Sequence, residues 1–196
     1  MRITFALALI TGCADNGNED ATQPVDESWA ADELTFQPIA EDGISVEYLE
    51  PTRYLGLWYE IATVPSGPQR NCTGTTAEYG IIDDETVSVD NSCYLYDLDG
   101  QQSLISGSAT FLDDSYTRLA VDLGFGFNAP YMVTELDGSE GEEPYQFAAV
   151  SSVRTLWILS RQPDMDEELY DELISRLGER GYPVEDLELT LQPSVD

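Results

Sequence analysis

Residues 54–65 read YLGLWYEIATVP, an aromatic run in which Gly56 stands two places before Trp58. Beyond this start, apolar and polar side chains alternate with a period of two, which indicates strands with one buried and one solvent-facing side. The other strongly patterned stretch is TLWILSRQP at 155–163, where an apolar run ends at Arg161. These two stretches enclose the part of the chain that we predict to be β-sheet.

The alternating pattern is interrupted by short turn sequences rich in Asp, Gly and Pro. It predicts eight strands, at residues 57–64, 73–81, 86–95, 103–112, 117–123, 131–136, 145–151 and 154–161. Consecutive strands at this spacing predict an all-β fold, an antiparallel up-and-down sandwich or barrel. A closed eight-stranded barrel has room inside for one small apolar ligand.

One helix is predicted after the last strand. Asp164 can cap its start, and Glu167 three residues later completes a pair similar to a capping box. Gly181 and Pro183 are typical of a helix end. Between these signals an apolar stripe recurs every four residues, at Met165, Leu169, Leu173 and Leu177. We expect the stripe to pack against the outside of the barrel.

The charge of the chain excludes several functions. There are 38 acidic residues against 8 basic ones, all arginine, which gives a net charge of −30. Such a chain is repelled by nucleic acids, so we expect no nucleic-acid partner. It contains no histidine and no lysine, and therefore lacks the usual general base, the commonest metal ligand and any Schiff-base nucleophile. We expect no catalytic residue, no metal site and no cofactor.

Residues 1–12 have the features of an export signal. Their apolar run is too short to span a bilayer permanently, which takes about 20 residues, but it fits a secretory signal peptide. The residues up to Cys13 resemble a bacterial lipoprotein signal. That resemblance implies cleavage before Cys13, acyl chains such as palmitate on it and, because Ala14 follows, an outer-membrane anchor facing the periplasm or the cell surface. The alternative is an ordinary signal peptide with an incidental cysteine.

Residues 14–50 carry 11 acidic residues and no basic one. A segment of this composition buries too little apolar surface to fold by itself. We therefore predict three parts: a signal at 1–12, a disordered acidic tether at 13–47 and a barrel domain at 48–196.

The two patterned stretches together resemble the lipocalin family, in its bacterial outer-membrane lipoprotein (Blc, apolipoprotein D-like) type. Gly56-Leu57-Trp58-Tyr59 is similar to the Gly-x-Trp signature of the first lipocalin strand, and LWILSR at 156–161 is similar to the strand before the family's helix. The resemblance covers roughly residues 48–193. It implies an eight-stranded barrel with one C-terminal helix packed outside, and a structural closed end in which Arg161 lies over Trp58.

A candidate ligand-binding lining follows from the alternation. If Glu78 faces outwards, its neighbours Ala77 and Tyr79 face inwards, and the same count places Val87, Val89, Ala109 and Phe111 inside. Aromatic residues with a polar tip suit a long amphiphile. The candidate set is Tyr79, Val89, Phe111, Phe125, Tyr131, Tyr145 and Phe147, with Phe125 and Phe127 as a flap at the mouth. The alternative is that these aromatics only fill the barrel.

Cys72 and Cys93 flank a predicted hairpin. A loop centred at 82–83 would set Cys72 opposite Cys93, although the loop length or a bulge could change this pairing by one or two residues. In an oxidising compartment the two thiols should form a disulfide beside the barrel mouth. The alternative is a pair of buried thiols.

These observations predict a carrier or store for a small hydrophobic or amphipathic ligand, and the resemblance implies fatty acids or lysophospholipids. No enzymatic activity is expected. One alternative is an enzyme on the same fold, with an inward acid such as Glu135 raised in pKa by burial. Another is a barrel with a filled interior that acts through its surface. The oligomeric state stays open.

Overall fold

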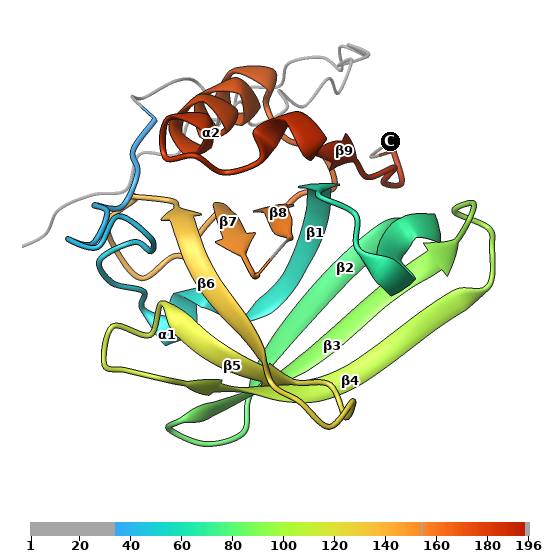
Figure 1. Ribbon diagram of the computed structural model, residues 1–196, viewed down its shortest axis with the longest axis horizontal. Coiled ribbons are helices and arrows are strands. Elements are labelled where there is room, and N and C mark those ends of the chain that lie inside the picture. The colour runs from blue at the N-terminus through green and yellow to red at the C-terminus, as the bar shows by residue number, and fades with distance from the viewer. Residues whose placement is uncertain (1–33, 154, 195–196) are drawn as a thin grey trace, which may run out of the picture. The chain divides into compact units, whose positions relative to one another are not determined.

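The computed structural model describes residues 34–153 and 155–194. It confirms the predicted closed antiparallel barrel, whose eight strands follow one another in sequence order around the wall (Figure 1). The strands are β1 (Gly56–Thr63), β2 (Cys72–Ile81), β3 (Thr86–Leu95), β4 (Gln102–Phe111), β5 (Arg118–Asp122), β6 (Ala129–Leu136), β7 (Phe147–Ser151) and β8 (Leu156–Ser160). The bounds agree with the predicted strands to within two residues at every end.

The barrel closes through β1, which pairs with β8 on one side and with β2 on the other. The pairing with β2 is limited to the first half of β1, from Gly56 opposite Tyr79 to Tyr59 opposite Thr76. Further along, the short strand β9 (Glu188–Leu189) pairs with β1 instead. The C-terminal segment therefore completes the wall where β1 and β2 separate.

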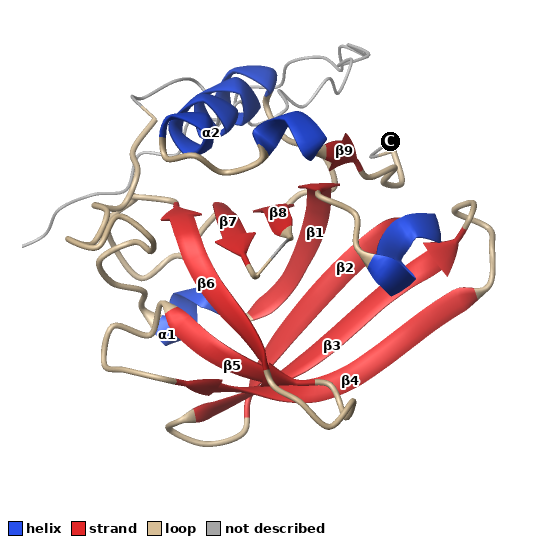
Figure 2. Ribbon diagram, in the orientation of Figure 1, coloured by secondary structure: helices blue, strands red, loops and turns tan. Residues whose placement is uncertain are grey.

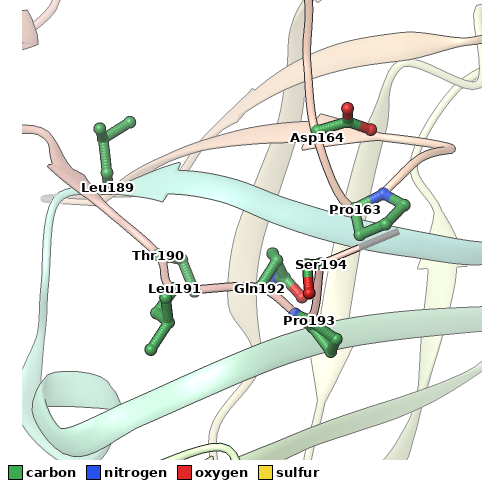
Figure 3. Close-up of a pocket in the computed structure, with 8 residues that line it drawn as sticks. All are labelled: Pro163, Asp164, Leu189, Thr190, Leu191, Gln192, Pro193 and Ser194. Carbon is green, nitrogen blue, oxygen red and sulfur yellow. The ribbon is translucent and has the colours of Figure 1, made fainter. Parts of the chain in front are cut away.

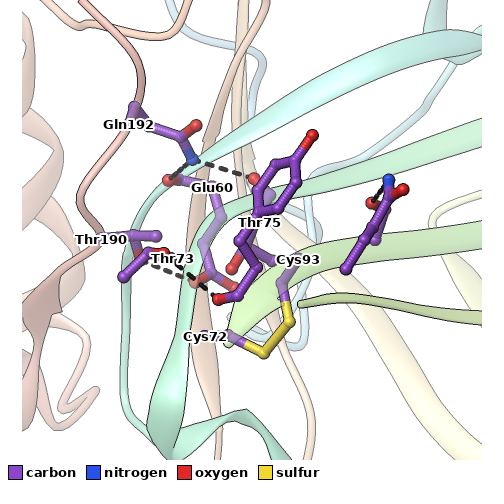
Figure 4. Close-up of a disulfide and its surroundings, with 10 residues drawn as sticks. Glu60, Cys72, Thr73, Thr75, Cys93, Thr190 and Gln192 are labelled. Atoms are coloured by element: carbon purple, nitrogen blue, oxygen red, sulfur yellow. Dashed lines mark hydrogen bonds between the residues drawn. A yellow bond between two sulfur atoms is a disulfide. The ribbon is translucent and has the colours of Figure 1, made fainter. Parts of the chain in front are cut away.

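Residues 190–192 continue this closure with hydrogen bonds to both strands. Thr190 donates its backbone N–H to Ile61, and Gly74 donates its own to the carbonyl of Leu191. The side-chain amide of Gln192 donates to the carbonyls of Glu60 and Thr75, at 2.8 and 2.9 Å (Figure 4). One glutamine thus joins β1 to β2 across the gap, which the sequence pattern did not predict.

The longest helix of the described residues, α2 (Glu167–Glu179), packs on the outer side of the barrel as expected (Figure 2). Its buried stripe of Leu169, Leu173 and Leu177 meets the outward side chains of β1, β7 and β8. Each buried leucine contributes about 1.5–3 kcal/mol relative to exposure. The helix starts later than predicted, because Asp166 caps it and accepts from the N–H groups of Glu168 and Leu169.

The predicted N-terminal cap, Asp164, is wrong: its side chain does not cap the helix, and its carbonyl accepts a hydrogen bond from the Ser160 hydroxyl. At the other end the prediction holds. Gly181 follows the helix with φ +82, a left-handed conformation that glycine adopts without steric cost. A short 3-10 helix, η2 (Val184–Asp186), then leads into β9.

The predicted tether boundary at residue 47 is also wrong for the part that the structure describes. Residues 34–47 run along the end of β6, where Phe36 pairs with Asp137 and Val46 donates to Val133. Val46 and Leu49 are completely buried. These few apolar residues anchor the segment despite its acidic composition, so the packed domain begins earlier than predicted. Residues 1–33, including the signal and Cys13, lie outside the described residues.

The helix α1 (Pro51–Tyr54) leads from this segment into β1 at what we call the closed end of the barrel. The loops β2–β3, β4–β5 and β6–β7 share this end. The other loops, including the 3-10 helix η1 (Gly67–Asn71) between β1 and β2, form the open end. Within residues 34–153 and 155–194 no helix has both the length and the apolarity to cross a membrane.

The disulfide between Cys72 and Cys93 is present, with a Cα–Cα distance of 5.4 Å (Figure 4). The predicted pairing was wrong by two residues, because Cys72 lies opposite Leu95. The loop between β2 and β3 is longer than assumed, and an irregularity between Thr73 and Thr76 compensates for part of the difference. The disulfide therefore joins diagonal rather than facing positions of the hairpin, at the open end.

Candidate functional site

A cavity of about 610 Å³ occupies the interior of the barrel and extends to the loops of the open end. This volume lies within the range of small-molecule binding pockets. Its apolar wall includes Ala77, Val87, Val89 and Ala109, at the inward positions that the alternation predicted. Ile105, Leu119 and Val121, which were not predicted, also line it. Phe125 and Phe127 line it from the β5–β6 loop, with ring centroids 6.5 Å apart. The interior is thus open to a ligand rather than filled.

Three tyrosines line the cavity towards the closed end, and we call them the tyrosine floor: Tyr54, Tyr79 and Tyr131. The hydroxyl of Tyr131 lies 2.7 Å from that of Tyr54 and 2.9 Å from that of Tyr79, so the three form a hydrogen-bonded chain. Burial raises the pKa of Tyr54 and Tyr131 well above the ordinary value, and that of Tyr79 to about 12. All three hydroxyls are therefore protonated at neutral pH.

Below the floor, Arg161 and Trp58 make the contact that the resemblance implied. The guanidinium carbon lies 3.8 Å from the centre of the buried indole. The same guanidinium donates to the carbonyls of Leu57, Leu55, Arg53 and Tyr145, at 2.7–3.0 Å. Gly56 has φ +91 at this point, and a side chain there would start 3.5 Å from the guanidinium. These contacts hold the start of β1 against the end of β8.

One acidic side chain, Glu60, also lines the cavity, and it is only 5% exposed. Its Oε1 accepts a hydrogen bond of 2.6 Å from the hydroxyl of Thr190 on the C-terminal segment (Figure 4). Burial raises the pKa of Glu60, while the hydrogen bond from Thr190 acts in the opposite direction. The cavity wall thus carries a carboxyl group that is costly to ionise.

The raised pKa of Glu60 predicts a pH-dependent stability. An acid whose pKa is higher in the folded state stabilises the fold fully below its ordinary pKa, and this contribution is lost as the pH rises through the raised value. Glutamine at position 60 stays neutral throughout. We therefore expect Glu60→Gln to gain unfolding free energy relative to the wild type as the pH rises from 4 to 8, measured by urea denaturation. A difference that does not change with pH would contradict this prediction.

The structure places five of the seven predicted lining residues in the cavity: Tyr79, Val89, Phe111, Phe125 and Tyr131. The placement of Tyr145 was wrong. It is buried at the closed end, where its hydroxyl accepts from the N–H of Glu50 and Arg53 lies 4.0 Å above its ring.

The placement of Phe147 was also wrong. It points out of the barrel into the core beneath α2, 5.2 Å from the ring of Phe36. All five residues of β7 are buried, because this strand has the cavity side on one face and the helix on the other. In a strand that is buried on both faces, the alternation of polar and apolar residues does not show which side chains point into the barrel.

Glu135, the predicted inward acid, lies instead on the helix side of β6. It is completely buried and forms ion pairs with Arg180 at 2.7 Å and Arg176 at 3.1 Å, both from α2. The carboxylate is therefore occupied in joining the helix to the barrel. It cannot serve as an acid within the cavity.

The residues missed from the sequence include two polar ones, Glu60 and Tyr54. Glu60 stands two places after Trp58, so the period of two that places the indole inside could have placed the carboxyl inside as well. Tyr54 lies in α1 before the first strand, where no alternation applies. Its position became visible only in the structure.

A second hollow, of about 580 Å³, lies on the C-terminal segment, lined by Pro163, Asp164 and residues 189–194 (Figure 3). The polar side chains of Thr190 and Gln192 here are already engaged with Glu60, Thr75 and the wall strands. In the described part of the chain no three His, Cys, Asp or Glu side chains are placed to hold a metal ion. The barrel cavity is therefore the candidate site.

An eight-stranded antiparallel barrel that is closed at one end and has an open apolar cavity is typical of proteins that bind small molecules inside the barrel. The family model described as "Lipocalin-like domain" matches residues 49–192, and the chain belongs to this family. It is 35% identical over 143 residues to outer membrane lipoprotein Blc of Vibrio cholerae, covering 70% of this chain and 79% of the relative.

Two further comparisons agree with this. The chain is 33% identical over 155 residues to temperature-induced lipocalin-1 of Arabidopsis thaliana, covering 75% of this chain and 81% of the relative. Among solved structures, lobster apocrustacyanin A1 superposes with a TM-score of 0.60 at 19% identity, covering 72% of this chain and 79% of the other. The likeness to apocrustacyanin A1 concerns the fold alone.

Proposed function

We propose that the protein binds a small hydrophobic or amphipathic molecule in the barrel cavity and carries or stores it without changing it chemically. The observation that carries this proposal is the 610 Å³ cavity, whose lining is mainly apolar and which extends to the open-end loops. A long acyl chain matches such a lining, because burying its CH₂ groups stabilises the complex by about 0.8 kcal/mol each. Fatty acids and lysophospholipids are the ligand classes that we propose to test.

We propose further that the protein acts at the bacterial outer membrane, anchored through acyl chains on Cys13. Two observations support this: the lipoprotein-like sequence before Cys13, and the name of the Vibrio cholerae relative, an outer membrane lipoprotein. Several acyl chains give a stable anchor, which would hold a domain that its negative charge repels from anionic lipid. Mass spectrometry of the mature N-terminus tests the anchor, since an unmodified Cys13 would contradict it.

The two alternative functions receive less support. A barrel that acts only through its surface does not need an interior cavity of this size. An enzyme would need a reactive group in the cavity, and the predicted acid, Glu135, is paired with two arginines on the outer side. Glu60, Tyr116 and the tyrosine floor are the titratable groups of the described lining, and no observation favours a reaction at them.

The binding proposal predicts that filling the cavity abolishes binding. Ala109 lines the cavity, whereas its neighbour Thr110 on β4 is exposed on the outer face. We expect Ala109→Phe to weaken binding of a fluorescent long-chain fatty acid by more than about tenfold, because its ring takes the volume of several CH₂ groups. Fluorescence titration gives the affinity.

Thr110→Phe is the matched control, with the same added ring on the opposite face of the strand. It should bind within about twofold of the wild type. Equal affinities for both variants would contradict binding in the cavity, provided that urea denaturation shows both to be folded.

A further inference from the structure

The tyrosine floor has one more proton donor than it can use internally. Each of its three hydroxyls carries one proton, and the two hydrogen bonds between them use two of the three. This count holds whichever way each hydroxyl points. Within the described residues no other group makes a hydrogen bond to these three oxygens. One O–H is therefore left to meet an acceptor in the cavity, and a buried donor without an acceptor is destabilising.

The charges below the floor indicate which kind of acceptor is favoured. Arg161 and Arg53 lie at the closed end and donate to carbonyl groups and to a serine hydroxyl. The described part of the chain contains three ion pairs, and neither of these two arginines takes part in them. The charge of Arg161 reaches the floor, where it opposes the rise in pKa of Tyr54 and Tyr79. An oxygen with negative charge is favoured there.

The remainder of the cavity, away from the tyrosine floor, does not favour a negatively charged ligand group. Its described lining contains the carboxyl group of Glu60 and no arginine. An ionised ligand group held near Glu60 would gain no opposite charge, and ionisation of Glu60 would repel it. The apolar side chains of Phe125 and Phe127 at the open end suit a hydrocarbon instead.

We propose that the cavity takes a long-chain ligand with its oxygen end inwards, so that a carboxyl or carbonyl oxygen accepts the free proton of the tyrosine floor. The hydrocarbon tail then points to the open end, beside Phe125 and Phe127. This inference rests on the proposed binding function and narrows its ligand class. It selects fatty acids over lysophospholipids, because the oxygen group of a fatty acid ends the molecule. In a lysophospholipid the glycerophosphate head group lies beyond the acyl carbonyl and would have to be buried at the closed end together with it.

The orientation can be measured with bromine-labelled fatty acids, since bromine quenches tryptophan fluorescence at contact range. The full chain with Trp29→Phe and Trp157→Phe keeps Trp58 as its one tryptophan, 5.0 Å from the ring of Tyr54. We expect 2-bromohexadecanoic acid to quench Trp58 more strongly than 16-bromohexadecanoic acid. Stronger or equal quenching by the 16-bromo acid would overturn the proposed orientation. If hexadecanoic acid and a lysophospholipid both fail to displace a bound apolar dye, the binding function itself fails, which is a different result.

The tyrosine floor is tested by removing all three of its hydroxyls, because any single Tyr→Phe change still leaves at least one free O–H. The triple variant Tyr54→Phe, Tyr79→Phe and Tyr131→Phe keeps the rings but has no O–H at the floor, and Tyr116→Phe removes a hydroxyl from another tyrosine that lines the cavity. We expect the triple variant to bind hexadecanoic acid about tenfold more weakly, with an unchanged affinity for an apolar dye. Tyr116→Phe should stay within about twofold of the wild type for both probes. An equal loss in the triple variant and in Tyr116→Phe, or no loss in the triple variant, would overturn the assignment of the acceptor site.

Discussion

Replacement of Trp58 by alanine is expected to lower the free energy of unfolding by about 4 kcal/mol, within the range typical of a buried tryptophan. The side chain is completely buried. Its Nε1 donates to the carbonyl of Tyr54 at 2.8 Å, and its ring contacts the guanidinium of Arg161 and the ring of Tyr54. The substitution leaves a cavity, an unpaired buried carbonyl and an arginine without its aromatic partner. Urea denaturation followed by circular dichroism measures the loss.

Trp157→Ala is the matched control, since Trp157 is a second tryptophan of the barrel but only partly buried, on the cavity wall. It should cost clearly less stability, because the ligand cavity beside it already lacks close packing on one side. If both substitutions cost the same, Trp58 has no special part in closing the barrel. A loss below about 1 kcal/mol for Trp58→Ala would lead to the same conclusion.

Replacement of Arg180 by methionine is expected to lower the free energy of unfolding by about 3 kcal/mol. Arg180 donates to the buried carboxylate of Glu135 and to the carbonyl of Thr134, at 2.7 and 2.6 Å. The other terminal nitrogen of Arg180, Nη2, donates to the carbonyls of Gly43 and Ile44. Methionine keeps the apolar stem but leaves a fully buried carboxylate with one arginine fewer. The same denaturation measurement checks this prediction.

Arg176→Met serves as the comparison, because its side chain is 31% exposed against 16% for Arg180, and it pairs with the same carboxylate. We expect it to cost about 1 kcal/mol, close to the value for exposed ion pairs. The combination of Arg176→Leu, Glu135→Leu and Arg180→Met removes all three charges. It should restore most of the stability, since no buried charge is then left unpaired. A combined variant less stable than Arg180→Met alone would contradict this account.

The sequence predicted the barrel well because its strands alternate in polarity. β3 and β4 have one face in the cavity and the other in solvent, so Val87, Val89 and Ala109 could be placed inside by counting. The contact between Trp58 and Arg161 did not follow from alternation. It came from the resemblance to a family, since nothing in the spacing of two residues about 100 positions apart indicates that they touch.

Two of the errors, at Phe147 and Glu135, share one physical cause, which is that a segment with no face in solvent gives no pattern to read. Phe147 lies in such a strand, and Glu135 is a buried charge whose partners come from the helix. The acidic segment at 34–47 was predicted to be disordered from its composition, yet a few apolar residues such as Phe36 and Val46 determine where it packs. Tertiary partners decide all of these positions, and no local sequence window contains them.

The C-terminal seam between β1 and β2 has a consequence for the order of folding. Residues 188–192 follow all eight strands of the barrel and α2 in the chain. Until this segment docks, the wall between Glu60 and Thr75 lacks the amide of Gln192 that bridges it. A folding intermediate without this segment therefore has a barrel that is open along its side as well as at its mouth. The side of the cavity is closed only when a segment from beyond the helix has returned to the wall.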